Sequence, residues 1–260
     1  MTEQHAESVR PYYQDGVSTI YTGDCLDVMG HLASQSVDLV LTDLPYGMTA
    51  CAWDSRLPLP DLWAAWRRVL SPDGTVVLTA SQPFTSALVM SNPRAFKHEW
   101  IWKKNAGSNF GTVKRQPMKE HESVLVFAWG RYHYSPIMQE RAPSGLARVR
   151  SGVVNYATTT EAYADSLHGE VTSQRPDLRY PSSVQPFNRE RGLHPTQKPV
   201  ALMAYLIRTY TAPGAVVLDC CMGSGTTLVA AKQEGRLAIG IEMDGRYCEV
   251  AANRLAEEAA

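Results

Sequence analysis

The sequence predicts an α/β fold built around a mostly parallel sheet, and three observations support this. The chain has 260 residues, of which 44% are apolar, which is enough for one sizeable core. Short strand-like apolar runs alternate with amphipathic segments of helical length. Near the C-terminus a strand, a glycine-containing loop, a helix and a second strand follow one another, which is the pattern of a nucleotide-binding βαβ unit.

The N-terminal half supplies the first strands of the expected sheet. The apolar run at 37–42 predicts a short buried strand, which Leu44-Pro45-Tyr46-Gly47 ends abruptly. A functional loop could therefore follow this strand. The further elements expected here are a helix at 62–70 and strands at 75–79, 99–103 and 123–129.

The C-terminal part carries the regular βαβ pattern. A helix at 200–210 begins directly after Pro199, a residue favoured near a helix start. The βαβ unit then comprises a strand at 215–219, a loop at 222–227, a helix at 228–234 and a strand at 237–242. Eighteen residues remain after Glu242, enough for one helix. The other strands of a parallel sheet must therefore come from the residues before 130.

Between these two parts the pattern changes. Residues 131–192 are rich in Pro, Ser, Arg and Tyr and show no sustained periodicity. We therefore expect two halves of one domain, at 18–130 and 193–260, separated by an irregular insertion at 131–192.

Composition narrows the possible classes of protein. The formal net charge is −1, so any nucleic-acid contact must come from a local basic cluster. The N-terminal stretch has no apolar run, and we expect a soluble protein of the cytoplasm. The five cysteines contain no C-x-x-C pair and the histidines lack ligand spacing, so no metal site or disulfide framework is expected.

The loop after the strand at 215–219 is the first candidate site. Gly223 and Gly225 let the backbone turn tightly and approach a ligand, and Glu242 at the end of the next strand could bind ribose hydroxyls. A dinucleotide site would prefer a third glycine where Leu228 stands, so a nucleoside ligand without phosphate fits better. A tight turn without any ligand would use the same two glycines.

The second candidate site is Asp43-Leu44-Pro45-Tyr46. An aromatic amine is a poor nucleophile because its lone pair is delocalised into the ring. The Asp43 carboxylate and the Leu44 carbonyl could accept its two N–H bonds and favour a pyramidal nitrogen that attacks a methyl group. Pro45 stiffens the loop, and Tyr46 offers a flat face for an extruded base. A plain strand-ending turn remains the alternative for the tetrapeptide alone.

Three motifs in a fixed order extend this interpretation. T-D-L-P-Y-G comes first, H-P-T-Q-K-P-V follows, and L-D-C-C-M-G-S-G-T-T comes last. This arrangement resembles the beta group of DNA amino-methyltransferases, most closely the solitary, often phage-borne adenine methyltransferases, over most of residues 18–252. The resemblance implies a Rossmann-like, S-adenosylmethionine-dependent methyltransferase fold with circularly permuted motif order. It also implies DNA as substrate, with 131–192 reading the target sequence.

The resemblance assigns roles residue by residue. Asp43, Leu44, Pro45 and Tyr46 would form the catalytic loop. The cofactor-binding residues it implies are Asp24, Lys198, Asp219, Gly223, Ser224, Gly225, Thr226 and Glu242. Two residues depart from the family pattern: Leu44 stands where Pro is usual, and Cys221 stands where Phe is usual.

Basic residues between 102 and 119 are the expected DNA contacts. The candidates for phosphate binding are Lys103, Lys104, Lys114 and Arg115. A solvated loop would have the same composition, and either a monomer or a homodimer is compatible with the sequence. The alternatives that stay open are a cytosine-N4 methyltransferase and a DNA-binding relative that has lost catalysis. A protein or RNA methyltransferase and a dinucleotide-dependent dehydrogenase fit the motif order and the glycine loop less well.

Overall fold

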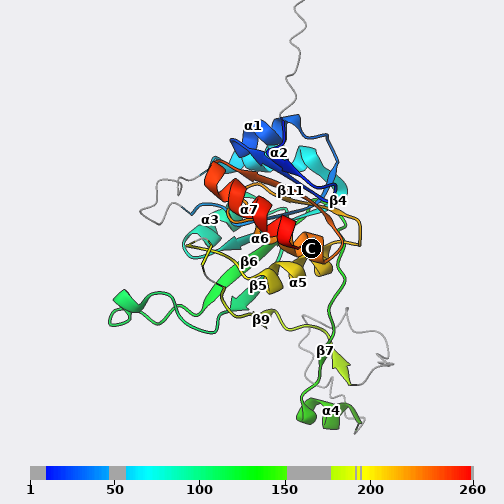
Figure 1. Ribbon diagram of the computed structural model, residues 1–260. Helices are drawn as coiled ribbons and strands as arrows, with labels where there is room; N and C mark the ends of the chain where they lie inside the picture. Colours follow the sequence, from blue (N-terminus) through cyan, green and yellow to red (C-terminus); the bar gives the residue numbers. More distant parts are fainter. Residues whose placement is uncertain (1–9, 47–56, 151–176, 191, 194, 259–260) are drawn as a thin grey trace, which may run out of the picture. The chain divides into compact units, whose positions relative to one another are not determined.

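The computed structural model describes residues 10–46, 57–150, 177–190, 192–193 and 195–258, without the side chains of 148–150. It divides into two compact units, Met1–Ser135 with Ser183–Ala260, and Pro136–Ser182. The first unit is an α/β structure and contains the βαβ pattern seen in the sequence (Figure 1). The second unit comprises β7 (Gln139–Glu140), α4 (Pro143–Arg150) and β8 (Leu178–Arg179), and its two strands pair antiparallel.

The first unit contains a nine-stranded sheet of order β1-β2-β11-β10-β3-β4-β6-β5-β9. Its strands are β1 (Tyr13–Gln14), β2 (Ser18–Thr22), β3 (Val37–Thr42), β4 (Leu70–Ala80), β5 (Phe96–Lys103), β6 (His121–Phe127), β9 (Val184–Pro186), β10 (Val216–Asp219) and β11 (Leu237–Glu242). The run from β2 through β11, β10 and β3 to β4 is parallel throughout. Antiparallel pairing occurs between β1 and β2, β4 and β6, and β6 and β5.

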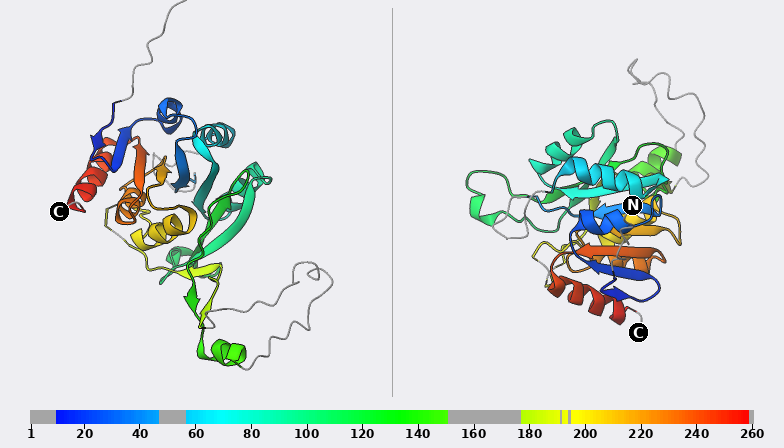
Figure 2. Two further views of the ribbon diagram at one scale, coloured as in Figure 1. Left: turned by 90° about the vertical axis from the view of Figure 1, so that its right-hand side faces the viewer. Right: turned by 90° about the horizontal axis from the view of Figure 1, so that it is seen from above.

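Helices cover both faces of this sheet (Figure 2). One face carries α1 (Cys25–His31), α2 (Leu59–Val69) and α3 (Phe84–Ser91). The other carries α5 (Val200–Tyr210), α6 (Thr226–Gln233) and α7 (Gly245–Glu257). The core between them is apolar, and Val37, Leu39 and Val40 of β3 have no exposed surface. Among the described residues, no helix is both long and apolar enough to cross a membrane.

Most expected elements are present with shifted ends. The helix expected at 62–70 starts earlier, at Leu59, because Pro58 and Pro60 fit the first turn of a helix. Residues 71–74, with the sequence Ser-Pro-Asp-Gly, have the composition of a turn but lie inside β4, where the pairing with β3 jumps from Val37–Leu70 to Leu39–Thr75. These residues therefore interrupt the register of the pairing with β3 but do not end the strand. Helices α1 and α3 and strand β2 were not expected.

Candidate active site

The parallel strands end at one edge of the sheet, and this edge holds the candidate site. Because β2, β11, β10 and β3 run in the same direction, their carboxyl ends meet there. A cavity of about 480 Å³ lies at this edge, within the range of about 300–1,000 Å³ typical of small-molecule sites. The sequence-predicted residues that line it are Asp24, Asp43, Leu44, Pro45, Tyr46, Lys104, Lys198, Asp219, Gly223, Ser224, Thr226 and Glu242.

Carboxylates gather where β10 and β11 end. Glu242 accepts hydrogen bonds from the backbone N–H groups of Gly223 at 3.0 Å and Asp244 at 2.9 Å. Asp219 accepts from the Thr42 hydroxyl at 2.7 Å and from the Cys221 N–H at 3.1 Å. Burial raises the pKa of Asp219 to about 6 and also raises the pKa of Glu242. Both side chains line the cavity, so each carboxylate can also bind a ligand.

Asp24 has a structural task besides lining the cavity. Its Oδ1 accepts a hydrogen bond from the Leu26 N–H at 2.8 Å and caps the N-terminus of α1. This capping fixes the start of α1, whose first residue is Cys25.

The glycine loop packs against α7 on its rear side. Gly225 has a φ of 76°, and a Cβ there would lie 2.6 Å from the Cβ of Ala251. The close neighbour of position 225 is therefore helix α7, and Gly225 is not among the residues that line the cavity. Arg254 of α7 donates to the Ser224 carbonyl at 2.6 Å and to the Thr226 hydroxyl at 3.1 Å. Sequence reasoning did not identify Arg254.

The loop after β3 presents Asp43 to the cavity. Its Oδ1 accepts from the Tyr46 hydroxyl at 2.7 Å and from the Thr79 hydroxyl, and its Oδ2 accepts from the Lys198 ammonium. The Tyr46 ring lies 5.2 Å from the Phe84 ring, centroid to centroid, with 33° between the planes. Leu44 is buried. These contacts fix the direction of the Asp43 carboxylate.

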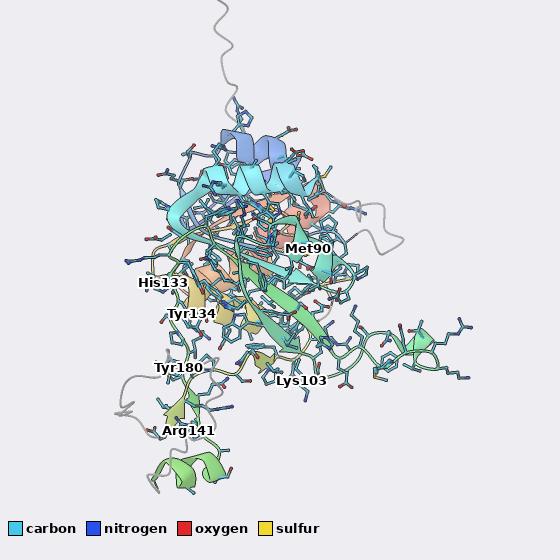
Figure 3. All side chains as sticks on the ribbon, turned by 180° about the vertical axis from the view of Figure 1, so that it is seen from behind. Met90, Lys103, His133, Tyr134, Arg141 and Tyr180 are labelled. Carbon is cyan, nitrogen blue, oxygen red and sulfur yellow. The ribbon has the colours of Figure 1, made fainter. Side chains whose placement is uncertain are left out.

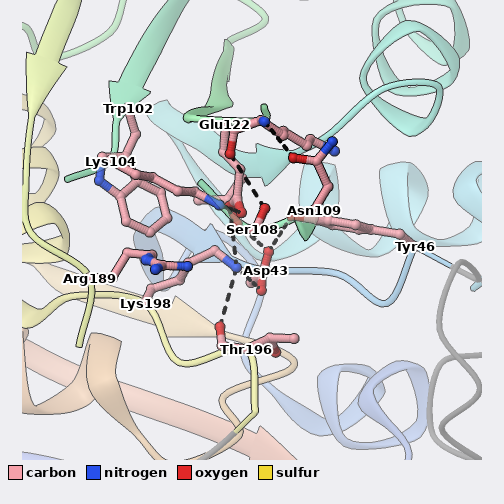
Figure 4. A network of polar contacts seen from close by, with 12 residues as sticks. Asp43, Tyr46, Trp102, Lys104, Ser108, Asn109, Glu122, Arg189, Thr196 and Lys198 are labelled. Carbon is pink, nitrogen blue, oxygen red and sulfur yellow. Dashed lines mark hydrogen bonds and ion pairs between the residues drawn. The ribbon is translucent and has the colours of Figure 1, made fainter. Parts of the chain in front are cut away.

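Four charged side chains, one of them Asp43, alternate in sign along a chain of ion pairs (Figure 4). Lys104 pairs with Glu122, Glu122 lies 3.6 Å from the Lys198 ammonium, and Lys198 pairs with Asp43. Burial opposes the charge on Lys198, but the two carboxylates outweigh burial and raise its pKa. Lys198 therefore stays protonated. We call Lys104, Glu122, Lys198 and Asp43 the charge quartet.

The charge quartet changes the expectation for Lys104. The side chain of Lys104 is only 6% exposed and lies over the Trp102 ring, 5.0 Å from its centroid. A buried, paired ammonium cannot serve as a free phosphate contact, because breaking the ion pair would leave the mostly buried Glu122 carboxylate without Lys104 as its partner. Lys198, expected as a cofactor residue, lines the cavity but makes its ion pairs with Asp43 and Glu122. Glu122 carried no sequence motif and was not identified.

The other expected DNA contacts lie outside the cavity. Lys103, Lys114 and Arg115 are exposed, and Lys103 lies at the end of β5 (Figure 3). The segment between β5 and β6 contains a short 3₁₀ helix at Phe110–Thr112. Asn109 closes this segment, because its side chain accepts from the Lys119 N–H at 2.6 Å and donates to the Pro117 carbonyl at 3.0 Å.

Three thiols meet beside Asp219. The Sγ atoms of Cys25, Cys220 and Cys221 all lie within 4.8 Å of one another. Hydrogen bonds from the Cys220 and Cys221 thiols lower the pKa of Cys25. Sequence spacing gave no sign of this cluster, because Cys25, the first residue of α1, lies almost 200 positions earlier in the chain.

Comparison with known proteins gives consistent matches over most of the chain. A family model described as DNA methylase, for N6 and N4 methyltransferases, matches residues 37–253. The type II methyltransferase M1.MboII of Moraxella bovis is 27% identical over 258 residues, covering 89% of this chain and 94% of that protein.

Solved structures agree with this match. The M1.HpyAVI–SAM complex has a TM-score of 0.63 at 25% identity, covering 91% of this chain and 99% of that one. The cytosine-N4-specific PvuII DNA methyltransferase has a TM-score of 0.66 at 18% identity, covering 94% and 88%, and indicates the shared fold. The expected mostly parallel α/β methyltransferase fold is thereby confirmed.

Proposed function

The chain belongs to the family of DNA methylases that act on N6 of adenine or N4 of cytosine with S-adenosylmethionine as methyl donor, and from this premise we propose that its target is N6 of adenine. The observation that carries the proposal is the Asp43 carboxylate, which lines the same cavity as Asp219 and Glu242.

The cavity suits the cofactor chemically. S-adenosylmethionine supplies an electrophilic methyl group on a positively charged sulfonium. Asp24, Asp219 and Glu242 line the cavity at the strand ends, and their carboxylates attract such a cation and would repel a phosphate. We propose that Glu242 accepts hydrogen bonds from the ribose hydroxyls, and that Asp219 and the Gly223 to Thr226 loop hold the methionine part.

Asp43 would act on the target amine. An ionised carboxylate has about four lone-pair positions, and Tyr46, Thr79 and Lys198 fill three of them. One position is left for an N–H of the target amine, and the Leu44 carbonyl would accept the other N–H. Both bonds favour a pyramidal nitrogen whose lone pair points at the methyl group. Lys198 would hold the Asp43 carboxylate fixed in direction.

The choice of adenine depends on the first residue of the catalytic loop. A carboxylate is a stronger acceptor than a hydroxyl and draws the amine proton more effectively. Enzymes with Asp at this position resemble the adenine group, whereas Ser is commoner in the cytosine-N4 group. The PvuII enzyme, a cytosine-N4 methyltransferase, shares the fold, so N4 of cytosine is the second candidate.

Analysis of the product tests the base directly. DNA from cells that express the protein is digested to nucleosides, and N6-methyladenine is expected. N4-methylcytosine alone would overturn the choice of adenine and leave the methyltransferase assignment standing. The Asp43→Ala variant should lose nearly all turnover and still bind S-adenosylmethionine in calorimetry. A wild-type protein without cofactor binding would instead indicate a relative that has lost catalysis.

The target base should leave the duplex during the reaction, because an enzyme cannot otherwise reach its exocyclic amine. Tyr46 then offers a stacking surface, and Tyr46→Ala should weaken this stacking by about 1–3 kcal/mol. A fluorescent base analogue at the target position should brighten on complex formation with wild-type protein.

We further propose that residues 131–192 read the sequence around the target.

A further inference from the structure

The three thiols beside Asp219 form a group that methyl transfer does not use. Cys25 begins α1, and Cys220 and Cys221 follow β10 directly. Cys25 and Cys220 are buried, and Cys221 is partly exposed. All three line the cavity. Among the described residues, these three side chains form the group whose ligand atoms lie close enough together to hold a metal ion.

The spacing suits a thiolate site after a small adjustment. Zn²⁺ binds sulfur at about 2.3 Å, so tetrahedral geometry places two sulfur ligands about 3.8 Å apart. The three Sγ atoms already lie within 4.8 Å of one another. Contraction by about 1 Å or less would complete the site, which side-chain rotation can supply.

The surroundings favour a cation. The carboxylates of Asp24 and Asp219 belong to the residues next to Cys25 and Cys220 in the chain. The Cys220 thiol lies 3.7 Å from the Thr42 hydroxyl, and the Cys221 N–H is bonded to Asp219. Partners of this kind orient metal ligands. Because all three residues line the cavity, an ion has an entry path, and a fourth ligand position can face the cavity.

We propose that Cys25, Cys220 and Cys221 bind one thiophilic divalent cation of the Zn²⁺ class through three thiolates in the wall of the cavity. This site goes beyond methyl transfer and does not depend on which base is methylated. The ion forms three metal–sulfur bonds as the thiols release their protons to solvent. Since Cys221 stands in the cavity wall, the bound ion and S-adenosylmethionine should weaken each other's binding.

Cadmium titration of the reduced full-length protein tests the site. Cd²⁺ prefers the same ligands as Zn²⁺, and each Cd–thiolate bond absorbs in the ultraviolet. One equivalent should produce a charge-transfer band with the intensity of three thiolates, and Zn²⁺ should remove it by competition. Absence of the band in wild-type protein, or an intensity of one thiolate, would overturn the proposal without reference to any variant.

Single substitutions locate the ligands. Loss of a group that only hydrogen-bonds to a metal ligand lowers the metal affinity by about 10–100-fold. Loss of a ligand itself should lower the affinity further, and we expect this of Cys25→Ser, Cys220→Ser and Cys221→Ser. Cys248→Ser is the matched control, because Cys248 is also buried but lies outside the cluster. Circular dichroism checks that each variant folds. Equal Cd²⁺ binding by folded cluster variants and the control would rule the three cysteines out as ligands.

Discussion

At the scale of single residues, the charge quartet links the chemistry of Asp43 to the stability of the protein. Lys198 is the one member that contacts two carboxylates, Asp43 and Glu122. The Lys198 ammonium therefore holds two carboxylates together in a partly buried site. The H-P-T-Q-K-P motif supplies this lysine from a segment far from Asp43 in the sequence.

Removing the Lys198 ammonium should destabilise the protein. Loss of one partner from a buried ion pair costs about 3–5 kcal/mol, and we expect about 3 kcal/mol because the Asp43 side chain is 23% exposed. Denaturant unfolding of Lys198→Met measures this. Lys103→Met is the control, since Lys103 is exposed and should change stability by about 0.5 kcal/mol or less. Equal stability of the two variants would contradict the role of the ammonium.

The raised pKa of Asp219 makes cofactor binding depend on pH, if Asp219 holds the methionine part as proposed. Burial raises this pKa to about 6. A positively charged ligand favours the carboxylate, so below pH 6 binding must first remove a proton and becomes weaker. Affinity for S-adenosylmethionine should rise from pH 5 to 7, by at most about tenfold per unit. Calorimetry on wild type and Asp219→Asn separates this contribution, and the same pH dependence in both proteins would refute it.

Site residues could be predicted from the sequence where a local motif carries them. Asp43 and Glu242 each follow or end a recognisable strand, so their place at the sheet edge follows from the fold. Glu122 and Arg254 belong to no motif, and their importance arises from partners far away in the chain. The thiol cluster was missed for the same reason, because spacing rules apply only to ligands that are close in sequence.

At the scale of elements, the glycine loop is shaped by the helix behind it. The residue at 225 combines a left-handed backbone with close approach to Ala251 of α7. Left-handed conformation costs about 1–2 kcal/mol for a residue with a Cβ, and the collision adds an overpacking cost of about 1–3 kcal/mol. Gly225 is therefore required by the packing of β10, α6 and α7.

Gly225→Ala should accordingly lose about 3 kcal/mol of stability in denaturant unfolding. Ala251→Gly removes the atom that collides, so the double variant should recover about 1 kcal/mol or more relative to the sum of the single changes. Backbone strain at position 225 should remain. A stable Gly225→Ala protein that fails to bind cofactor would show instead that this glycine faces the ligand.

The strands and longer helices were predictable because their apolar patterns are local. The strand expected at 237–242 is β11, and the helix expected at 200–210 is α5. Helix α1 was missed because seven residues are too few to show helical periodicity, although Asp24 caps it. Helix α3 was missed because it is apolar on most sides and has no side-chain cap.

At the scale of the whole molecule, strand direction explains which charges meet. β6 runs antiparallel to β4, so its first residues, including Glu122, lie at the edge where the parallel strands end. β5 runs antiparallel to β6, so its last residue, Lys103, reaches that edge and Lys97 lies near the opposite edge. No local pattern in the sequence encodes these directions, and for this reason the role of Glu122 required the structure.

The same geometry gives a test of the DNA-binding face. Lys103, Lys114 and Arg115 are exposed and belong to β5 and the segment that follows it at the active-site edge. Each phosphate contact releases counterions and contributes about −0.9 to the slope of log K against log salt concentration. Replacing one of the three by Ala should make the slope shallower by up to about 0.9, and replacing all three by up to about 2.7. Fluorescence anisotropy with a labelled duplex at several salt concentrations measures these slopes.

Lys97→Ala is the matched control, because Lys97 is an exposed lysine on the same strand but near the opposite edge. Lys103→Ala and Lys97→Ala each lower the net charge by one, so a general electrostatic effect would change the salt slopes of both variants alike. Contact at the active-site edge predicts that Lys103→Ala changes the slope and Lys97→Ala leaves it as in wild type. Equal slopes for the two variants would show that DNA does not approach along this edge, and the route from the duplex to Asp43 would have to lie elsewhere.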